Sequence, residues 1–324
     1  MEPLLDVRNL RVRFTNDFGY REVTDGISFH VNPGEFLGIV GESGSGKSVT
    51  SLALMGLLAR NGSVAEGSAM FEGKDLLQLS EEELDAVRGK DICMIYQDAL
   101  ASLDPVFTIG NQMLEAIRRH VEPDKRKAWS VAVDYLGKCG LPDPEKIMKK
   151  YPHELSGGMR QRVMIAMALS CEPKLLIADE PTTALDVTIQ AQIMRMIRNV
   201  QKESGTAMIL ITHDIGLVAQ MADRVMVMYA GQIVEEAEVN ELFAHPLHPY
   251  TKALLASAPS IDDSEDRRLE SIRGSVPENY TDMNGCRFAG RCIYTGEPCS
   301  AHQEYRELLP GHYVRCWKSG KDKV

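Results

Sequence analysis

Apolar and polar positions along the first part of the chain follow the pattern of strands and helices in turn. From Leu5 to Phe14 apolar residues roughly alternate with polar ones, and Phe36–Val40 is a short apolar run that ends at a glycine-rich loop. Residues 48–58 are compatible with a helix, and Ser80-Glu81-Glu82-Glu83 matches a capping box at the start of another helix. The order strand, helix, strand is therefore expected.

Helical periodicity dominates the middle of the chain. Residues 109–150 fit helices, except at residues 140–144, where two prolines prevent continuation. Three apolar runs separated by helical stretches follow: Leu175–Ala178, Met208–Ile211 and Val225–Tyr229. Such runs are typical of buried parallel strands joined by crossover helices, so we predict an α/β core with a helical insert at about residues 100–170.

The pattern changes again near the C-terminus. Prolines recur from Pro246 onward, and the charged stretch 262–268 lies inside a predicted linker at residues 257–270. We therefore divide the chain into a main domain over residues 1–256 and a small C-terminal extension over residues 257–324.

Composition narrows the class of protein. Of 324 residues, 44% are hydrophobic and 25% are charged, which are ordinary globular values. Lys and Arg number 36 against 46 Asp and Glu, so the net charge is −10, and we expect no nucleic-acid partner. The first six residues lack a basic export signal, and the apolar runs are shorter than the about 20 residues that span a bilayer. Any membrane role is expected to need a partner.

The loop Gly41–Ser48 fits the P-loop pattern G-x-x-x-x-G-K-[ST] and lies between a predicted strand and a predicted helix. Glycines let successive backbone N–H groups approach phosphate oxygens, Lys47 reaches the terminal phosphates, and Ser48 binds Mg²⁺. The expected phosphate-binding residues are those of the loop and of the first helical turn: Gly41, Glu42, Ser43, Gly44, Ser45, Gly46, Lys47, Ser48 and Val49.

A second candidate element is the apolar strand that ends in Asp179-Glu180. Adjacent buried carboxylates are costly unless a cation or substrate uses them. Asp179 is expected to support the Mg²⁺ shell, and Glu180 to orient and deprotonate an attacking water. A solvated acidic strand end is the alternative.

Residues 155–161, Leu-Ser-Gly-Gly-Met-Arg-Gln, present a hydroxyl and two glycine amides at the start of an apolar helix, which forms another anion site. This segment resembles the signature loop of ATP-binding cassette ATPases, usually Leu-Ser-Gly-Gly-Gln, from which Met159 departs. The resemblance implies a P-loop ATPase cassette with a mainly parallel core sheet, an antiparallel β subdomain and a helical subdomain. It also implies that two cassettes close on ATP, so that the signature loop and D-loop of one contact the nucleotide of the other: Ser156, Gly157, Gly158, Met159 and Asp186.

The resemblance assigns the remaining roles one residue at a time. Gln97 matches the Q-loop glutamine, which joins Ser48 and Asp179 around Mg²⁺, and His213 matches the switch histidine that contacts the γ-phosphate. The implied catalytic residues are therefore Glu180, His213 and Gln97. A histidine at a strand end is otherwise more often structural. For adenine stacking, spacing favours Phe18, with Tyr20 as the rival.

Residues 243–255 and the tail that follows are similar to the C-terminal extension of oligopeptide and dipeptide importer ATPases. The resemblance implies ATP-driven peptide import at the cytoplasmic face of the cell membrane. Its implied partners are a related second ATPase, two permease subunits and an extracytoplasmic peptide-binding protein. A soluble cassette ATPase of DNA repair or iron–sulfur assembly, and an importer of nickel or another solute, remain the alternatives.

Four of the seven cysteines cluster in the tail: Cys286, Cys292, Cys299 and Cys316. Their spacing, C-x₅-C-x₆-C-x₁₆-C, would allow either tetrahedral zinc or an iron–sulfur cluster, and absence of a metal is a third possibility. The family resemblance favours a [4Fe–4S] cluster, with Zn²⁺ as the second choice. Cys93, Cys139 and Cys171 are expected to be core thiols.

Overall fold

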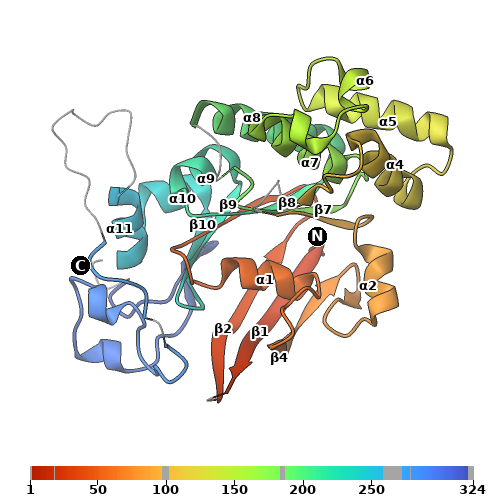
Figure 1. The fold of residues 1–324 in the computed structure, drawn as a ribbon. Coiled ribbons are helices and arrows are strands. Elements are labelled where there is room, and N and C mark those ends of the chain that lie inside the picture. Colours follow the sequence, from red (N-terminus) through yellow and green to blue (C-terminus); the bar gives the residue numbers. More distant parts are fainter. Residues whose placement is uncertain are drawn as a thin grey trace. The chain divides into compact units, whose positions relative to one another are not determined.

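The structure is a computed structural model that describes residues 2–17, 19–96, 102–182, 187–257, 272–277 and 279–319 (Figure 1). The chain divides into two compact units. The first, here the helical unit, comprises Met1–Pro3, Val31–Phe36 and Leu79–Leu210; the second, here the phosphate-loop unit, comprises Leu4–His30, Leu37–Gln78 and Ile211–Val324. Each is described by itself.

The helical unit contains a group of mutually packed helices and a set of short strands. Its helices are α2 (Glu81–Val87), α4 (Ile109–His120), α5 (Lys125–Lys138), α6 (Pro144–Ile147), the 3₁₀ turn η1 (Pro152–Glu154), α7 (Gly157–Leu169) and α8 (Val187–Ser204). Its strands are β6 (Ile92–Ile95), β7 (Leu175–Asp179) and most of β8 (Ala207–Thr212), in the order β8-β7-β6, with β6 and β7 parallel. Helices α4, α5 and α7 pack against one another, as expected for the helical insert, whose bounds at about residues 100–170 stay a prediction.

Local sequence explains where these helices begin. Ser80 forms the predicted capping box with Glu83 at the start of α2. The side chains of Thr108 and Asp124 accept backbone hydrogen bonds at the starts of α4 and α5. Pro144 stands in the first turn of α6, where its missing N–H costs nothing.

The phosphate-loop unit contains an antiparallel sheet with the order β2-β1-β4-β5. Its strands are β1 (Leu5–Asn16), β2 (Gly19–Val31), β4 (Gly62–Phe71) and β5 (Lys74–Asp75), and the long β1–β4 register runs from Leu5 opposite Phe71 to Phe14 opposite Gly62. Helix α1 (Lys47–Leu54) packs against β1 and β4 (Figure 1).

A mixed set of strands completes this unit. β3 (Phe36–Val40) and β9 (Arg224–Tyr229) are parallel, as predicted for buried strands, and β10 (Gln232–Glu238) returns antiparallel to β9. Helices α9 (Ile215–Met221), α10 (Val239–Ala244) and α11 (Pro249–Ser257) belong to the same unit.

The described part of the tail joins this unit. β12 (His312–Val314) pairs with β10, and β11 (Arg306–Leu309) pairs with β12, while η2 (Ala289–Arg291) and η3 (Glu297–Ser300) are short 3₁₀ turns. Tyr280 is fully buried. The tail therefore extends the sheet edge at β10; the boundary between residues 256 and 257 stays a prediction.

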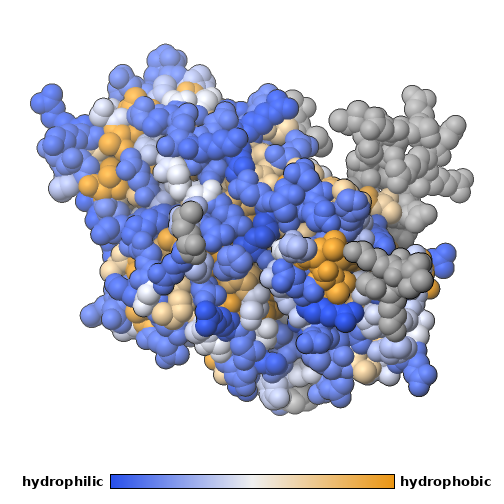
Figure 2. Space-filling model, turned by 180° about the vertical axis from the view of Figure 1, so that it is seen from behind, coloured by the Kyte–Doolittle hydropathy of each residue, from blue (hydrophilic) through white to orange (hydrophobic). Residues whose placement is uncertain are grey.

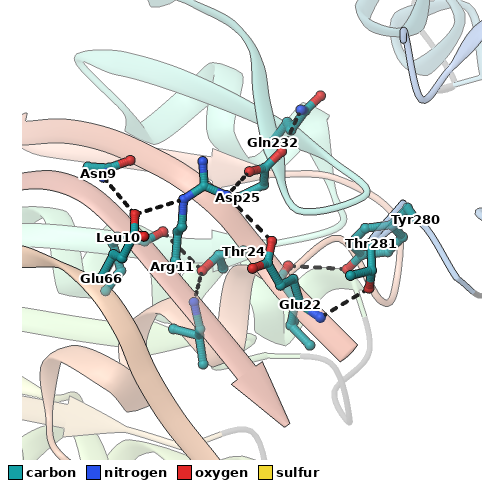
Figure 3. Close-up of polar contacts among 12 residues, drawn as sticks. Asn9, Leu10, Arg11, Glu22, Thr24, Asp25, Glu66, Gln232, Tyr280 and Thr281 are labelled. Atoms are coloured by element: carbon teal, nitrogen blue, oxygen red, sulfur yellow. Dashed lines mark hydrogen bonds and ion pairs between the residues drawn. The ribbon is translucent and has the colours of Figure 1, made fainter. Parts of the chain in front are cut away.

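A polar network crosses the phosphate-loop unit at Asp25 of β2 (Figure 3). Its carboxylate pairs with Arg11 of β1 and accepts a 2.9 Å hydrogen bond from Gln232 of β10. The guanidinium of Arg287, from the tail, lies 2.8 Å from the same carboxylate. Burial acts to raise the pKa of Asp25, but the bond from Gln232 and the two arginine charges outweigh burial and lower it. The network joins the antiparallel sheet, β10 and the tail.

The surface is polar over most of the face drawn in Figure 2, with apolar side chains in separate patches. Along the ranges that the structure describes, no helix combines the length and apolar character needed to cross a bilayer.

Candidate functional site

The predicted phosphate loop connects β3 to α1 and lies within one unit. Gly46 has φ +99° and caps the N-terminus of α1, and Gly44 has φ +79°, so both occupy conformations that side chains rarely adopt. A Cβ on Gly46 would lie 2.9 Å from the carbonyl oxygen of Val23, and one on Gly41 would lie 2.1 Å from that of Met228. The glycines therefore let the loop pass directly against the backbones of β2 and β9.

Lys47 is buried, with 5% of its surface exposed, at the first position of α1. Its Nζ donates hydrogen bonds to the carbonyl oxygens of Gly41 at 2.7 Å and Glu42 at 3.0 Å. The ammonium thus lies inside the curve of the loop, at the N-terminal end of α1. Both the charge and the backbone donors favour a bound phosphate. Ser48, the next residue, is half-buried.

Asp179 and Glu180 belong to the helical unit. Asp179 is the last residue of β7 and is 8% exposed. Glu180 has φ +46°, an uncommon left-handed conformation for a residue with a side chain. Such a backbone is typical of functional sites, where strain positions a group differently from the strand before it. The two adjacent carboxylates therefore have different surroundings, and their roles stay predictions.

The signature segment also lies in the helical unit, at the N-terminus of α7. The Ser156 hydroxyl caps this helix by accepting a 3.3 Å hydrogen bond from the backbone N–H of Met159. Ser156 and Gly157 are exposed. A Cβ on Gly158 would lie 3.2 Å from Cγ2 of Ile189 in α8, so this glycine permits α7 and α8 to pack closely. The segment has the geometry of an anion site.

The structure describes two of the five remaining predicted ATP-site residues, His213 and Tyr20. His213 is exposed directly after β8, and Tyr20 of β2 is exposed with the Arg13 guanidinium 5.4 Å from its ring centre. Phe18, Gln97 and Asp186 lie outside the described residues. The roles of all five residues stay predictions.

The four tail cysteines line one pocket in the phosphate-loop unit, here called the cysteine pocket: Cys286, Cys292, Cys299 and Cys316. Trp317 Nε1 donates a 3.0 Å hydrogen bond to the sulfur of Cys299, and the backbone N–H of Tyr294 donates one of 3.4 Å to that of Cys292. Burial, followed by the proximity of the other three thiols, raises the pKa of Cys286 to about 11. The spacing of the four cysteines in the sequence did not establish that they line one pocket.

His248 also lines the cysteine pocket and was missed by the sequence analysis. It is 1% exposed, and its Nδ1 accepts a 3.0 Å hydrogen bond from the backbone N–H of Tyr250. The proton of the neutral ring therefore lies on Nε2, which is buried and has no hydrogen-bond partner among the described residues. Within the described residues, no three His, Cys, Asp or Glu side chains gather closely enough to hold a single metal ion. Cys93, Cys139 and Cys171 are buried, which confirms them as core thiols.

The fold and the phosphate loop together define an ATPase cassette of the ABC transporter class. Residues 24–183 match the family described as ABC transporter, and residues 234–299 match the family described as Oligopeptide/dipeptide transporter, C-terminal region. The solved dimeric structure of MJ0796, a bacterial ABC transporter cassette, is 25% identical, with a TM-score of 0.66 over 72% of this chain and 98% of that one.

Relatives that match over nearly the full chain show to which group of ABC transporter ATPases it belongs. The oligopeptide transport ATP-binding protein OppD of Haemophilus influenzae is 49% identical over 99% of both chains. The oligopeptide transport ATP-binding protein AppD of Bacillus subtilis is 49% identical over 98% of this chain and 97% of its own. The chain belongs to the family of ATP-binding proteins of oligopeptide and dipeptide ABC transporters.

Proposed function

We propose that this chain binds and hydrolyses ATP to drive the import of oligopeptides or dipeptides across the cytoplasmic membrane. The observation that carries the proposal is the phosphate loop, with Lys47 held inside its curve, in a chain that also matches the peptide-transporter C-terminal region. That second match favours peptides over nickel or another solute, and transport over DNA repair or iron–sulfur assembly.

Within this function the loop from Gly41 to Val49 holds the phosphates of ATP. Ser48, Asp179 and Gln97 are the proposed residues around Mg²⁺, whose charge would offset that of the phosphates. Glu180 orients and deprotonates the attacking water, while His213 contacts the γ-phosphate. Adenine stacks on an aromatic residue, Phe18 or Tyr20.

A single cassette carries one phosphate loop and one signature segment, so a second ATPase subunit is needed to complete the site. Ser156 to Met159, with Asp186, would contact the nucleotide held by that subunit. Two permease subunits and an external peptide-binding protein complete the proposed importer, and they hold the chain at the cytoplasmic face. Val106 and Phe107, 71% and 51% exposed ahead of α4, are the candidate permease contact.

The variant Glu180→Gln tests the proposed chemistry. Because glutamine keeps the shape of the side chain but is no base, the variant should bind ATP normally, lose at least about 100-fold in turnover and accumulate the closed dimer. Nucleotide binding, phosphate release and gel-filtration mass measure the three effects. Normal steady-state hydrolysis would remove Glu180 from the catalytic role, whereas absence of ATP binding would overturn the proposed function itself.

We propose a [4Fe–4S] cluster held by the four cysteines that line the cysteine pocket. Zn²⁺, the second choice, is less favoured, because a single ion needs several ligands close together and the described side chains offer no such group. Such clusters take four thiolate ligands and are tuned by hydrogen bonds to sulfur. Three N–H groups surround this pocket: Trp317 Nε1, the backbone of Tyr294, and the unpartnered Nε2 of His248. Lys318 adds a positive charge to the lining. The cluster would supply redox chemistry or structural support at this place.

Iron, sulfide and zinc analysis of protein purified without air tests this second proposal. About four irons and four sulfides per chain are expected. Zinc alone, or no metal, would overturn the cluster assignment and leave the proposed ATP chemistry intact.

A further inference from the structure

The phosphate loop is held by Arg291, the residue before Cys292 of the cysteine pocket. Nη1 and Nη2 of Arg291 lie 2.9 Å and 3.0 Å from the two carboxylate oxygens of Glu42, the second residue of the loop. The Arg291 side chain is 7% exposed, and the residue directly precedes Cys292. A bidentate, charge-assisted pair of this kind fixes both position and orientation.

Two tyrosines hold the same loop. Tyr250 Oη accepts a 2.9 Å hydrogen bond from the backbone N–H of Glu42, and the Tyr280 hydroxyl is shared between the carbonyl oxygens of Val23 at 3.1 Å and Gly44 at 3.4 Å. Both rings are fully buried. Tyr250 also donates its backbone N–H to His248, which lines the cysteine pocket. Tyr250 therefore connects the loop, through His248, to the lining of the cysteine pocket.

The arginine beside another cysteine makes a parallel connection. Arg287 follows Cys286, is 4% exposed, and donates a 2.6 Å hydrogen bond to the carbonyl oxygen of Ala230. The next residue, Gly231, donates its N–H to the carbonyl oxygen of Ser45 at 3.0 Å. Residues 286–292 thus reach the phosphate loop by two routes, one at each end of the segment.

We propose that residues 286–292 couple the cysteine pocket to nucleotide binding, with Arg291 as the positioning residue for the phosphate loop. Arg291 holds the Glu42 carboxylate and compensates its negative charge next to the place where phosphates bind. A change at the thiol of Cys292 shifts Arg291, the residue before it, and thereby alters the affinity for nucleotide. Because coupling is reciprocal, nucleotide binding alters the free energy of the same change at Cys292 by an equal amount. The inference rests on the proposed ATP-binding function and adds regulation to the same site.

Charge compensation between Arg291 and Glu42 can be tested by measuring the Kd for Mg–ATP in single and double variants. Arg291→Met keeps an extended side chain but leaves Glu42 as an uncompensated anion that repels phosphate, so we expect the Kd for Mg–ATP to rise by about ten-fold. Adding Glu42→Gln removes that anion, and the double variant should recover most of the lost affinity. Loss through general misfolding would show no such recovery. Arg306→Met is the matched control and should leave Kd unchanged, because it removes a tail arginine whose guanidinium donates a 3.2 Å hydrogen bond to the carbonyl oxygen of Ser319 and not to the phosphate loop.

The reciprocal effect is measured at the cysteine. In the full chain freed of bound metal by a chelator, the rate at which iodoacetamide modifies Cys292, followed by peptide mass spectrometry, should fall by about three-fold with saturating Mg–ATP. This protection should disappear in Arg291→Met, measured at an ATP concentration that saturates the variant. Binding of ATP with no change at Cys292, or an unchanged Kd in Arg291→Met, overturns the coupling. Absence of any ATP binding in the wild type would instead overturn the proposed function.

Discussion

Gly46 shows why the phosphate loop tolerates no side chain at its junction with α1. Its φ of +99° is strained for any other residue, and a Cβ would lie 2.9 Å from the carbonyl oxygen of Val23. Gly311, between β11 and β12, has a comparable φ of +72° but no atom within 4 Å of a Cβ. A comparison of Gly46 with Gly311 therefore separates the effect of backbone strain from the effect of close contact with a neighbouring backbone.

Gly46→Ala should therefore weaken nucleotide binding by at least about ten-fold, because the loop must shift away from Val23, whereas Gly311→Ala should leave the Kd for ATP unchanged. Both variants should lose about 1–2 kcal/mol in the free energy of unfolding from the positive φ alone. Equilibrium nucleotide binding and urea unfolding measure the two quantities. Equal nucleotide affinities in the two variants would show that close approach at Gly46 is unimportant.

At the scale of single residues, the sequence predicted the site wherever the motif consists of residues close together in the chain. The spacing from Gly41 to Ser48 identified the loop, and the structure places Lys47 inside it. Arg291 and Tyr250 were not predicted, because each lies more than 200 residues from Glu42 and no local pattern marks so distant a partner. The φ of Glu180 was equally invisible, since a strand pattern carries no information on the residue after the strand ends.

At the scale of elements, strongly apolar runs were predictable. The strand at Phe36–Val40 has the expected bounds, and the apolar runs at β7, β8 and β9 are strands. The helix expected over residues 48–58 ends at Leu54, because Gly56 adopts φ +62° and the Leu57 N–H bonds back to the carbonyl oxygen of Leu52. Strands β2 and β4 were missed, since both carry many half-exposed polar residues and depend on pairing with β1.

Asp25 connects β2 to β1, β10 and the tail, so its protonation should change the stability of the fold at low pH. Its pKa is lowered in the folded state, mainly by Gln232, Arg287 and Arg11 acting against burial. A carboxyl with a depressed folded pKa contributes stability that is present above its unfolded value of about 4 and is lost as pH falls through the folded value.

Asp25→Asn should lower the free energy of unfolding by about 2 kcal/mol at pH 7, since it leaves the buried guanidinium of Arg287 without its anion. The difference between wild type and variant should shrink as pH falls below about 4. Urea unfolding at a series of pH values measures it, with Asp17→Asn, at an exposed position, as the control. A difference that stays constant down to the acid limit would contradict the assigned role of the ion pairs.

At the scale of the whole molecule, the proposed importer requires that ATP chemistry be transmitted to permease subunits. Val106 and Phe107 are large apolar residues exposed in the helical unit, and burying them in a partner would be favourable. The double variant Val106→Asp/Phe107→Asp should leave the Kd for ATP unchanged, because neither residue belongs to the phosphate loop.

Capture of the tagged chain from detergent-solubilised membranes of its own host, with mass spectrometry of every co-purifying chain, tests the assembly. We expect two multispanning permeases and a second ATPase with the wild type, and at least a five-fold lower permease yield with the double variant, since a charge buried in an interface costs roughly several kcal/mol. Val121→Asp, at another exposed apolar residue of the same unit, should not change the yield. Equal recovery with both variants would place the permease contact elsewhere. Capture of repair or cluster-assembly proteins in place of permeases would overturn import while leaving the ATP site as described.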